Sequence, residues 1–318
     1  MTAMPPFDRA RSPDSASLRD TLASSDAQLA AAVPVLQHLL SARDQSLFSD
    51  RIVARVRGML IDLAWQLLRI QAEATGEKAR EAFAAQHGEA LAERLFASKP
   101  LVAHCHALAI EWQLALELEG RLSLDTVLSP LLQSLVGHED SEVAGLAMAA
   151  LAAQTRFART QRRMELPLQE LAGDLFHATI ELWRANAAGS SVDALSRAVT
   201  RLRSGFDEGN TRRALFARLA ASLPQEASAM AIGKAGVALF LSAVADRTGR
   251  DRDLIALSTN DSQLARLAVA LRAAGLKPDE IDAQLLAIHP GTARQPEIDA
   301  IGIREASDAL AGTGGARS

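Results

Sequence analysis

The chain has 318 residues, of which 48% are hydrophobic, and it carries 34 Lys and Arg against 38 Asp and Glu for a formal net charge of −4. This length and apolar content can fill a sizeable core, and the nearly balanced charge gives no overall attraction to nucleic acid or to an anionic membrane. The single cysteine, Cys105, excludes an intrachain disulfide, as a reducing cytoplasm would allow.

The N-terminal residues 1–17 are rich in proline, serine and charge, which predicts a disordered segment without the continuous apolar stretch of an export signal. The most apolar window, Ala235 to Ala245, is about half as long as the ~20 residues that a bilayer crossing takes. We therefore expect a cytoplasmic protein with no membrane partner.

From residue 18 to 290, apolar residues recur at helical spacing and no strand-like alternation persists. This pattern predicts an all-α fold of about ten helices with no significant β-sheet. In the N-terminal helical region, 18–120, we expect a helix at Leu18–Leu40 with a kink or break at Pro34 and a second one, capped by Ser49 or Asp50, with an apolar face from Ile52 to Leu68. Two more are expected at Glu77–Phe96 and from a cap at Ser98 to Gly120.

A second helical region is expected over 121–290, followed by a flexible tail, 291–318, that ends in small residues. Gly275 is placed to end one of its last helices in the left-handed conformation. The expected helices of this region are 121–138 with an interruption near Pro130, Glu142 to about Met164, Leu166–Ala188, about 191–205 after a cap at Ser190, Thr211–Leu223 after a cap at Asn210, Lys234–Thr248, Asp251–Leu257, Asp261–Ala274 and Pro278–Ile288.

The helix from Glu142 is small and uncharged on the side of Gly145, Ala149 and Ala152, opposite its larger apolar residues. A helix without a polar face is expected to lie between neighbours, as in a stack of helical pairs, although no strict repeat period is present. The segment Leu131 to Phe157 is typical of a HEAT-type helical pair.

Three short motifs extend this similarity: Asp140-Ser141-Glu142-Val143-Ala144, Arg163-Met164-Glu165-Leu166-Pro167, and Ala265-Arg266-Leu267-Ala268 followed by Ala274-Gly275-Leu276. On these packing and capping motifs, the chain resembles a bacterial family of all-helical, HEAT-like proteins to which no function is assigned. The resemblance implies a helical array, and it implies no catalytic residue and no cofactor.

One helix face gathers three carboxylates and an imidazole. Its members, Glu170, Asp174, His177 and Glu181, fall within about 60° on a helix, and Asp174-x-x-His177 has the spacing of carboxylate-bridged metal bundles. Such a metal site needs a second acid-x-x-His motif, which the chain lacks. We therefore favour the solvated face of an amphipathic helix and keep a metal site or an enzyme as the alternative.

Other polar motifs fit known sites poorly. His104 and His106 point about 160° apart on a helix and cannot hold one metal, and Cys105 between them is expected to be a buried thiol. Lys234 follows a glycine, but the flanking residues do not match a phosphate-binding loop. No complete catalytic motif is present, so we predict no cofactor.

Two groups of arginines are typical of solvated helix faces and of ion pairs to neighbouring helices, and they are also the best candidates for a surface that contacts a partner. The contact residues that we predict are Arg156, Arg159, Arg163, Arg197, Arg201, Arg212 and Arg213. The leading hypothesis is a non-enzymatic helical interaction or regulatory protein that presents an extended surface to a protein partner. A nucleic-acid binder is disfavoured because no aromatic residue is interleaved with these arginines and the surrounding chain is acidic.

Overall fold

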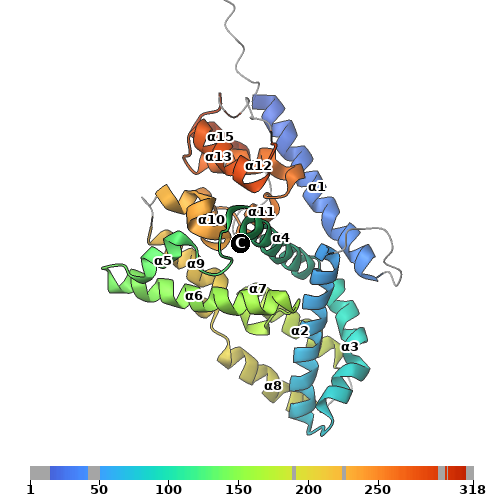
Figure 1. Ribbon diagram of the computed structural model, residues 1–318. Helices are drawn as coiled ribbons and strands as arrows, with labels where there is room; N and C mark the ends of the chain where they lie inside the picture. Colours follow the sequence, from blue (N-terminus) through green and yellow to red (C-terminus); the bar gives the residue numbers. More distant parts are fainter. Residues whose placement is uncertain are drawn as a thin grey trace, which may run out of the picture.

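The computed structural model of the protein describes residues 15–41, 51–187, 191–223, 227–292, 298 and 300–312. Within these ranges there is no β-sheet, which confirms the prediction of an all-α fold. The helices are α1 (Ser15–Ser41), α2 (Arg51–Thr75), α3 (Arg80–Phe96), α4 (Lys99–Leu122), α5 (Pro130–Val136), α6 (Ser141–Arg162), α7 (Gly173–Asn186), α8 (Val192–Gly205), α9 (Arg212–Ala221), α10 (Ile232–Thr248), α11 (Arg252–Leu257), α12 (Leu264–Ala273), α13 (Pro278–Ile288) and α15 (Ile303–Ala311) (Figure 1).

Helices α4 and α10 form the centre of the molecule. α4 packs against α1, α2, α3, α6, α10, α11 and α13, and α10 packs against α5, α9, α11, α12 and α13. Every residue of α10 from Ala235 to Ala245 is buried, as expected of a helix that is apolar on all sides. The most apolar window of the sequence is therefore a core helix, and in the described part of the chain no helix has the length and apolarity to cross a membrane.

The outer helices join segments from opposite ends of the chain. α1 lies against α12 and α15 at one end of the molecule, while α2 pairs with α3 and also contacts α8 at the other (Figure 1). These contacts join helices far apart in the chain, in addition to the contacts between chain neighbours that a row of helical pairs would have. Because α4 contacts helices on both sides of residue 120, the core is continuous across the boundary expected there.

Helix α6 starts where the sequence predicts but is not enclosed by neighbours. The Asp140 side chain caps it by accepting a hydrogen bond from the backbone N–H of Glu142 at 2.8 Å. Gly145 and Ala152 are exposed, and Met148 is 52% exposed. The expectation of a sandwiched helix is therefore wrong, because the small residues of this side face solvent.

The predicted helix Leu166–Ala188 is divided in two. Residues 168–170 form a short 3-10 turn, η1 (Leu168–Glu170), and α7 begins only at Gly173. The backbone N–H of Gly173 donates to Glu208 Oε1 at 2.9 Å, a long-range contact that periodicity does not reveal. α1, in contrast, continues through Pro34 without ending.

The C-terminal part of the chain that the structure describes contains one helix more than the sequence predicts. Gly275 takes the left-handed conformation predicted for it, with φ of 99°, and α13 spans the predicted residues. α15 packs on α1 and α12 through its buried residues Ala306, Ala309 and Leu310. Part of the predicted tail, Ile303–Ala311, is thus helical, while the predicted disorder of 1–17 lies, apart from residues 15–17, outside the described residues.

Candidate functional site

Six arginines line one cavity of about 470 Å³ beside the central helix α4. We call this cavity the arginine cleft. It is bordered by α4, α6, α9 and α11 and by the segment 163–170. Its basic residues are Arg156, Arg159, Arg163, Arg212, Arg213 and Arg252, and its carboxylates are Glu165, Glu170 and Asp253.

Two helix starts place the inner arginines. Arg212 is the first residue of α9, which is capped by the Thr211 side chain through a hydrogen bond from the backbone N–H of Ala214. Arg252 is the first residue of α11, whose cap is the Asp251 side chain. Because capped helix starts have a defined backbone geometry, both guanidinium groups leave the chain at fixed positions.

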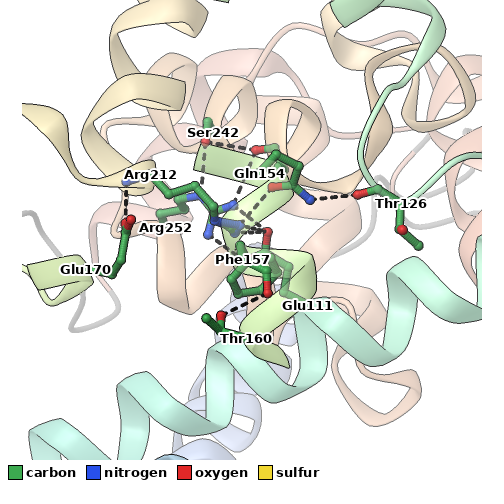
Figure 2. A network of polar contacts seen from close by, with 10 residues as sticks. Glu111, Thr126, Gln154, Phe157, Thr160, Glu170, Arg212, Ser242 and Arg252 are labelled. Carbon is green, nitrogen blue, oxygen red and sulfur yellow. Dashed lines mark hydrogen bonds and ion pairs between the residues drawn. The ribbon is translucent and has the colours of Figure 1, made fainter. Parts of the chain in front are cut away.

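The carboxylate of Glu111 holds both inner arginines beneath the cleft (Figure 2). Glu111 is only 1% exposed and lies on α4. Arg212 Nη1 donates to Glu111 Oε1 at 2.9 Å, and Arg252 donates through Nη1 to Oε2 and through Nη2 to Oε1, both at 2.8 Å. Burial would raise the pKa of Glu111, but the charges and hydrogen bonds of the two arginines outweigh it and lower this pKa to about 2.

Further contacts fix the orientation of the two guanidinium groups. Arg212 lies over the ring of Phe157, with 3.6 Å between its Cζ and the ring centroid, and it donates to Gln154 Oε1 at 3.3 Å. Arg252 Nε donates to Ser242 Oγ at 3.0 Å. The inner wall of the cleft is therefore a polar network in which both guanidinium groups have several partners (Figure 2).

The rim of the cleft carries exposed arginines from α6. Arg156, Arg159 and Arg163 are spaced by three and four residues, so they lie on one side of this helix and its C-cap. Arg156 forms an ion pair with Glu170, with 3.5 Å between Nη2 and Oε1. The guanidinium groups of Arg159 and Arg163 make no hydrogen bond or ion pair with any residue that the structure describes, so they can bind an anion.

A second cavity, of about 760 Å³, shares His104, Arg213, Arg252 and Asp253 with the arginine cleft. His104 is 4% exposed, and its Nδ1 lies 2.6 Å from Asp253 Oδ2. Asp253 also faces Arg213, with 3.3 Å between Oδ2 and Nη1. Burial would raise the pKa of Asp253, but the neighbouring His104, Arg213 and Arg252 lower it to about 2.

Five of the seven predicted contact arginines meet at this site. Arg156, Arg159, Arg163, Arg212 and Arg213 all line the cleft, although Arg212 is buried and serves the inner wall. Arg197 and Arg201 lie apart on α8, with exposed side chains that line neither cavity.

The predicted acidic face does not converge. Glu170 lies in η1 and accepts a hydrogen bond from the backbone N–H of Arg212 at 2.7 Å, whereas the other three residues are on α7. His177 packs edge-on against Phe176, and Glu181 forms ion pairs with Arg184 and Arg203. Among the described residues, no group of three or more His, Cys, Asp and Glu side chains is arranged to hold a metal ion.

Sequence reasoning missed four residues of the site: Glu111, His104, Arg252 and Asp253. One signal for Glu111 was available, because it is a charged residue between Ile110 and Trp112 on a helix that is otherwise apolar there. Comparison of the chain with protein-family models, with curated proteins and with solved structures gave no match. The function is therefore argued from the geometry of the cleft.

Proposed function

We propose that the protein binds a small organic anion, with carboxylate or phosphate groups, in the arginine cleft. The observation that carries this proposal is the gathering of six arginines and only three carboxylates around one cavity of about 470 Å³. Cavities of roughly 300 to 1,000 Å³ are typical of sites for small molecules. Guanidinium groups offer paired donors that match the oxygens of carboxylates and phosphates.

The division of the arginines supports this proposal. Arg212 and Arg252 share the single carboxylate of Glu111 and shape the wall, while Arg159 and Arg163 stand exposed at the rim. An anion that enters the cleft therefore gains two charge-assisted contacts without breaking an ion pair seen among the described residues. Arg156 adds a third contact if it exchanges Glu170 for the ligand.

The test is calorimetric titration of the full chain with citrate and with inorganic pyrophosphate at low salt. We expect binding that weakens as salt is added, because the rim is exposed and its charges are screened. The double substitution Arg159→Gln/Arg163→Gln is expected to weaken binding about a hundredfold or more, since it removes two charge-assisted hydrogen bonds that contribute about 1.5 kcal/mol or more each. The matched control, Arg197→Gln/Arg201→Gln on α8, removes the same charge and should leave affinity unchanged.

A protein partner, the leading hypothesis from the sequence, would use the same rim and is distinguished by a polyglutamate peptide. Binding of this peptide without binding of either small anion would overturn the proposal in favour of a partner with an acidic segment. Equal loss of affinity in the rim and control variants would show that net charge alone is responsible, and would also overturn it. A HEAT-like architecture and a cytoplasmic location remain predictions.

A further inference from the structure

The pairing of His104 with Asp253 carries an inference about the ligand that rests on the proposed function. His104 lies on α4 and Asp253 on α11, and both residues line the arginine cleft as well as the second cavity. His104 is thus part of the wall between the two cavities rather than of the solvent-exposed rim. A ligand held by the arginines would lie beside it.

The contact with Asp253 determines which ring nitrogen carries the proton. The pKa of Asp253 is lowered to about 2, so this carboxylate is ionised near neutral pH and can only accept hydrogen bonds. Its Oδ2 lies 2.6 Å from His104 Nδ1, which must therefore be the protonated, donating nitrogen. In a neutral imidazole, Nε2 is then an acceptor.

The Nε2 atom of His104 is buried and has no hydrogen-bond partner among the described residues. Buried polar atoms in folded proteins are generally hydrogen-bonded, and an exception calls for an explanation. His104 is nevertheless one of the residues that line both cavities. A ligand group that displaces the atoms covering Nε2 can supply the missing bond.

The charges around the ring decide which ligand group fits. Arg213, Arg252 and Asp253 line both cavities, with Asp253 in contact with Arg213 and with the ring, and Asp174, Glu208 and Asp251 line the second cavity. The arginines already provide positive charge for the acidic groups of an anion. A ring whose proton lies on Nδ1, toward Asp253, offers a lone pair at Nε2, which calls for a hydrogen-bond donor on the ligand.

We propose that His104 is a specificity-determining residue whose Nε2 accepts a hydrogen bond from a hydroxyl group of the bound anion. The ligand class is then a hydroxylated organic anion, such as a hydroxycarboxylate or a phosphorylated polyol. The arginines bind its acidic groups, and His104 distinguishes it from the same anion without the hydroxyl. Asp253 is the positioning residue that keeps Nε2 in its accepting form.

The experiment compares matched pairs of anions by calorimetric titration: malate with succinate, citrate with tricarballylate, and glycerol 3-phosphate with propyl phosphate. In each pair only the hydroxyl content differs. We expect the hydroxylated members to bind about tenfold more tightly, as a buried hydrogen bond to an otherwise unpaired acceptor predicts. Two variants then test the origin of this preference.

His104→Leu removes the acceptor, and the preference should fall below about twofold. Asp253→Asn keeps the shape and retains His104, but its amide can place the ring proton on Nε2, so the preference should also disappear. Asp253→Asn leaves Arg213 less neutralised and can strengthen both members of a pair, which is why the ratio within a pair is the readout. If His104→Leu does not fold, as judged by circular dichroism, Asp253→Asn still decides.

The outcomes separate this inference from the proposed function. If both members of every pair bind equally to the native protein, the cleft binds anions but His104 does not select them, and the inference is overturned. The same follows if Nε2 is protonated and donates to an anionic oxygen, because both members would then gain equally. If no anion of the panel or of the first titration binds, the proposed function fails and the inference fails with it.

Discussion

Replacing Glu111 by glutamine should be among the most destabilising single changes in this protein. The side chain is 1% exposed and is the shared carboxylate of Arg212 and Arg252, which are also buried. Glu111→Gln keeps the shape but leaves two buried cations without a counter-charge. Removing one partner of a buried ion pair costs about 3 to 5 kcal/mol, and we expect about 4 kcal/mol or more here because two arginines lose their partner.

The assay is urea unfolding followed by circular dichroism at 222 nm. With a urea dependence of about 3 kcal/mol/M for a protein of this size, the midpoint should fall by more than about 1 M. The control is Glu81→Gln, which removes the ion pair with Arg69 between side chains that are 70% and 42% exposed and should cost less than about 1 kcal/mol. Replacing Glu111, Arg212 and Arg252 together by Leu or Met should recover much of the loss, since no unpaired charge stays buried. A midpoint shift for Glu111→Gln as small as that for Glu81→Gln would refute the reasoning.

Three other predictions concern pH, backbone conformation and thiol reactivity. Burial lowers the pKa of His106 from 6.5 to about 4, so between these pH values the folded state binds fewer protons than the unfolded state. The free energy of unfolding should therefore fall by at most about 3 kcal/mol as the pH drops from 6.5 to 4. His106→Gln should remove this part of the pH dependence, measured as the midpoint of urea unfolding. Gly236→Ala should lower the free energy of unfolding by at least about 2 kcal/mol, because Gly236 has φ of 71° and the added Cβ would lie 2.8 Å from Ser129 Cβ. Gly145→Ala, on the exposed face of α6, should raise it by about 0.5 to 1 kcal/mol. Equal thermal midpoints for the two variants would contradict this. Cys105 is fully buried, and burial together with the charge of Asp253 raises the pKa of its thiol. The folded protein should therefore not react with a thiol reagent such as DTNB, while the urea-unfolded protein should release one equivalent of product. Rapid reaction of the folded protein would show that α4 is not packed as described.

Local signals in the sequence were sufficient for the fold class and for several helix ends. Asp140 caps α6, and Gly275 takes its left-handed conformation at the end of α12, because both effects depend on residues within one turn of a helix. The position of Pro278 and its following acidic residues likewise predicts the start of α13. These features follow from short-range chemistry and need no knowledge of the tertiary packing.

The candidate site depends on long-range contacts that periodicity cannot reveal. His104 and Asp253 are 149 positions apart, and Glu111 meets Arg212 and Arg252 across 101 and 141 positions. The clustering of arginines in the sequence indicated five of the six arginines of the cleft as contact residues, but not that α6, α9 and α11 bring them around one cavity. It also treated His104 only as half of a rejected metal pair.

The measurement that tests the central claim most directly is a crystal structure of the protein soaked with tungstate, an oxyanion whose anomalous scattering marks its position. The account predicts a tungstate peak in the arginine cleft within hydrogen-bond distance of Arg159 and Arg163, with Glu111 still bound to Arg212 and Arg252. A cleft that stays empty while tungstate occupies other arginines, such as Arg197 and Arg201 on α8, would contradict it.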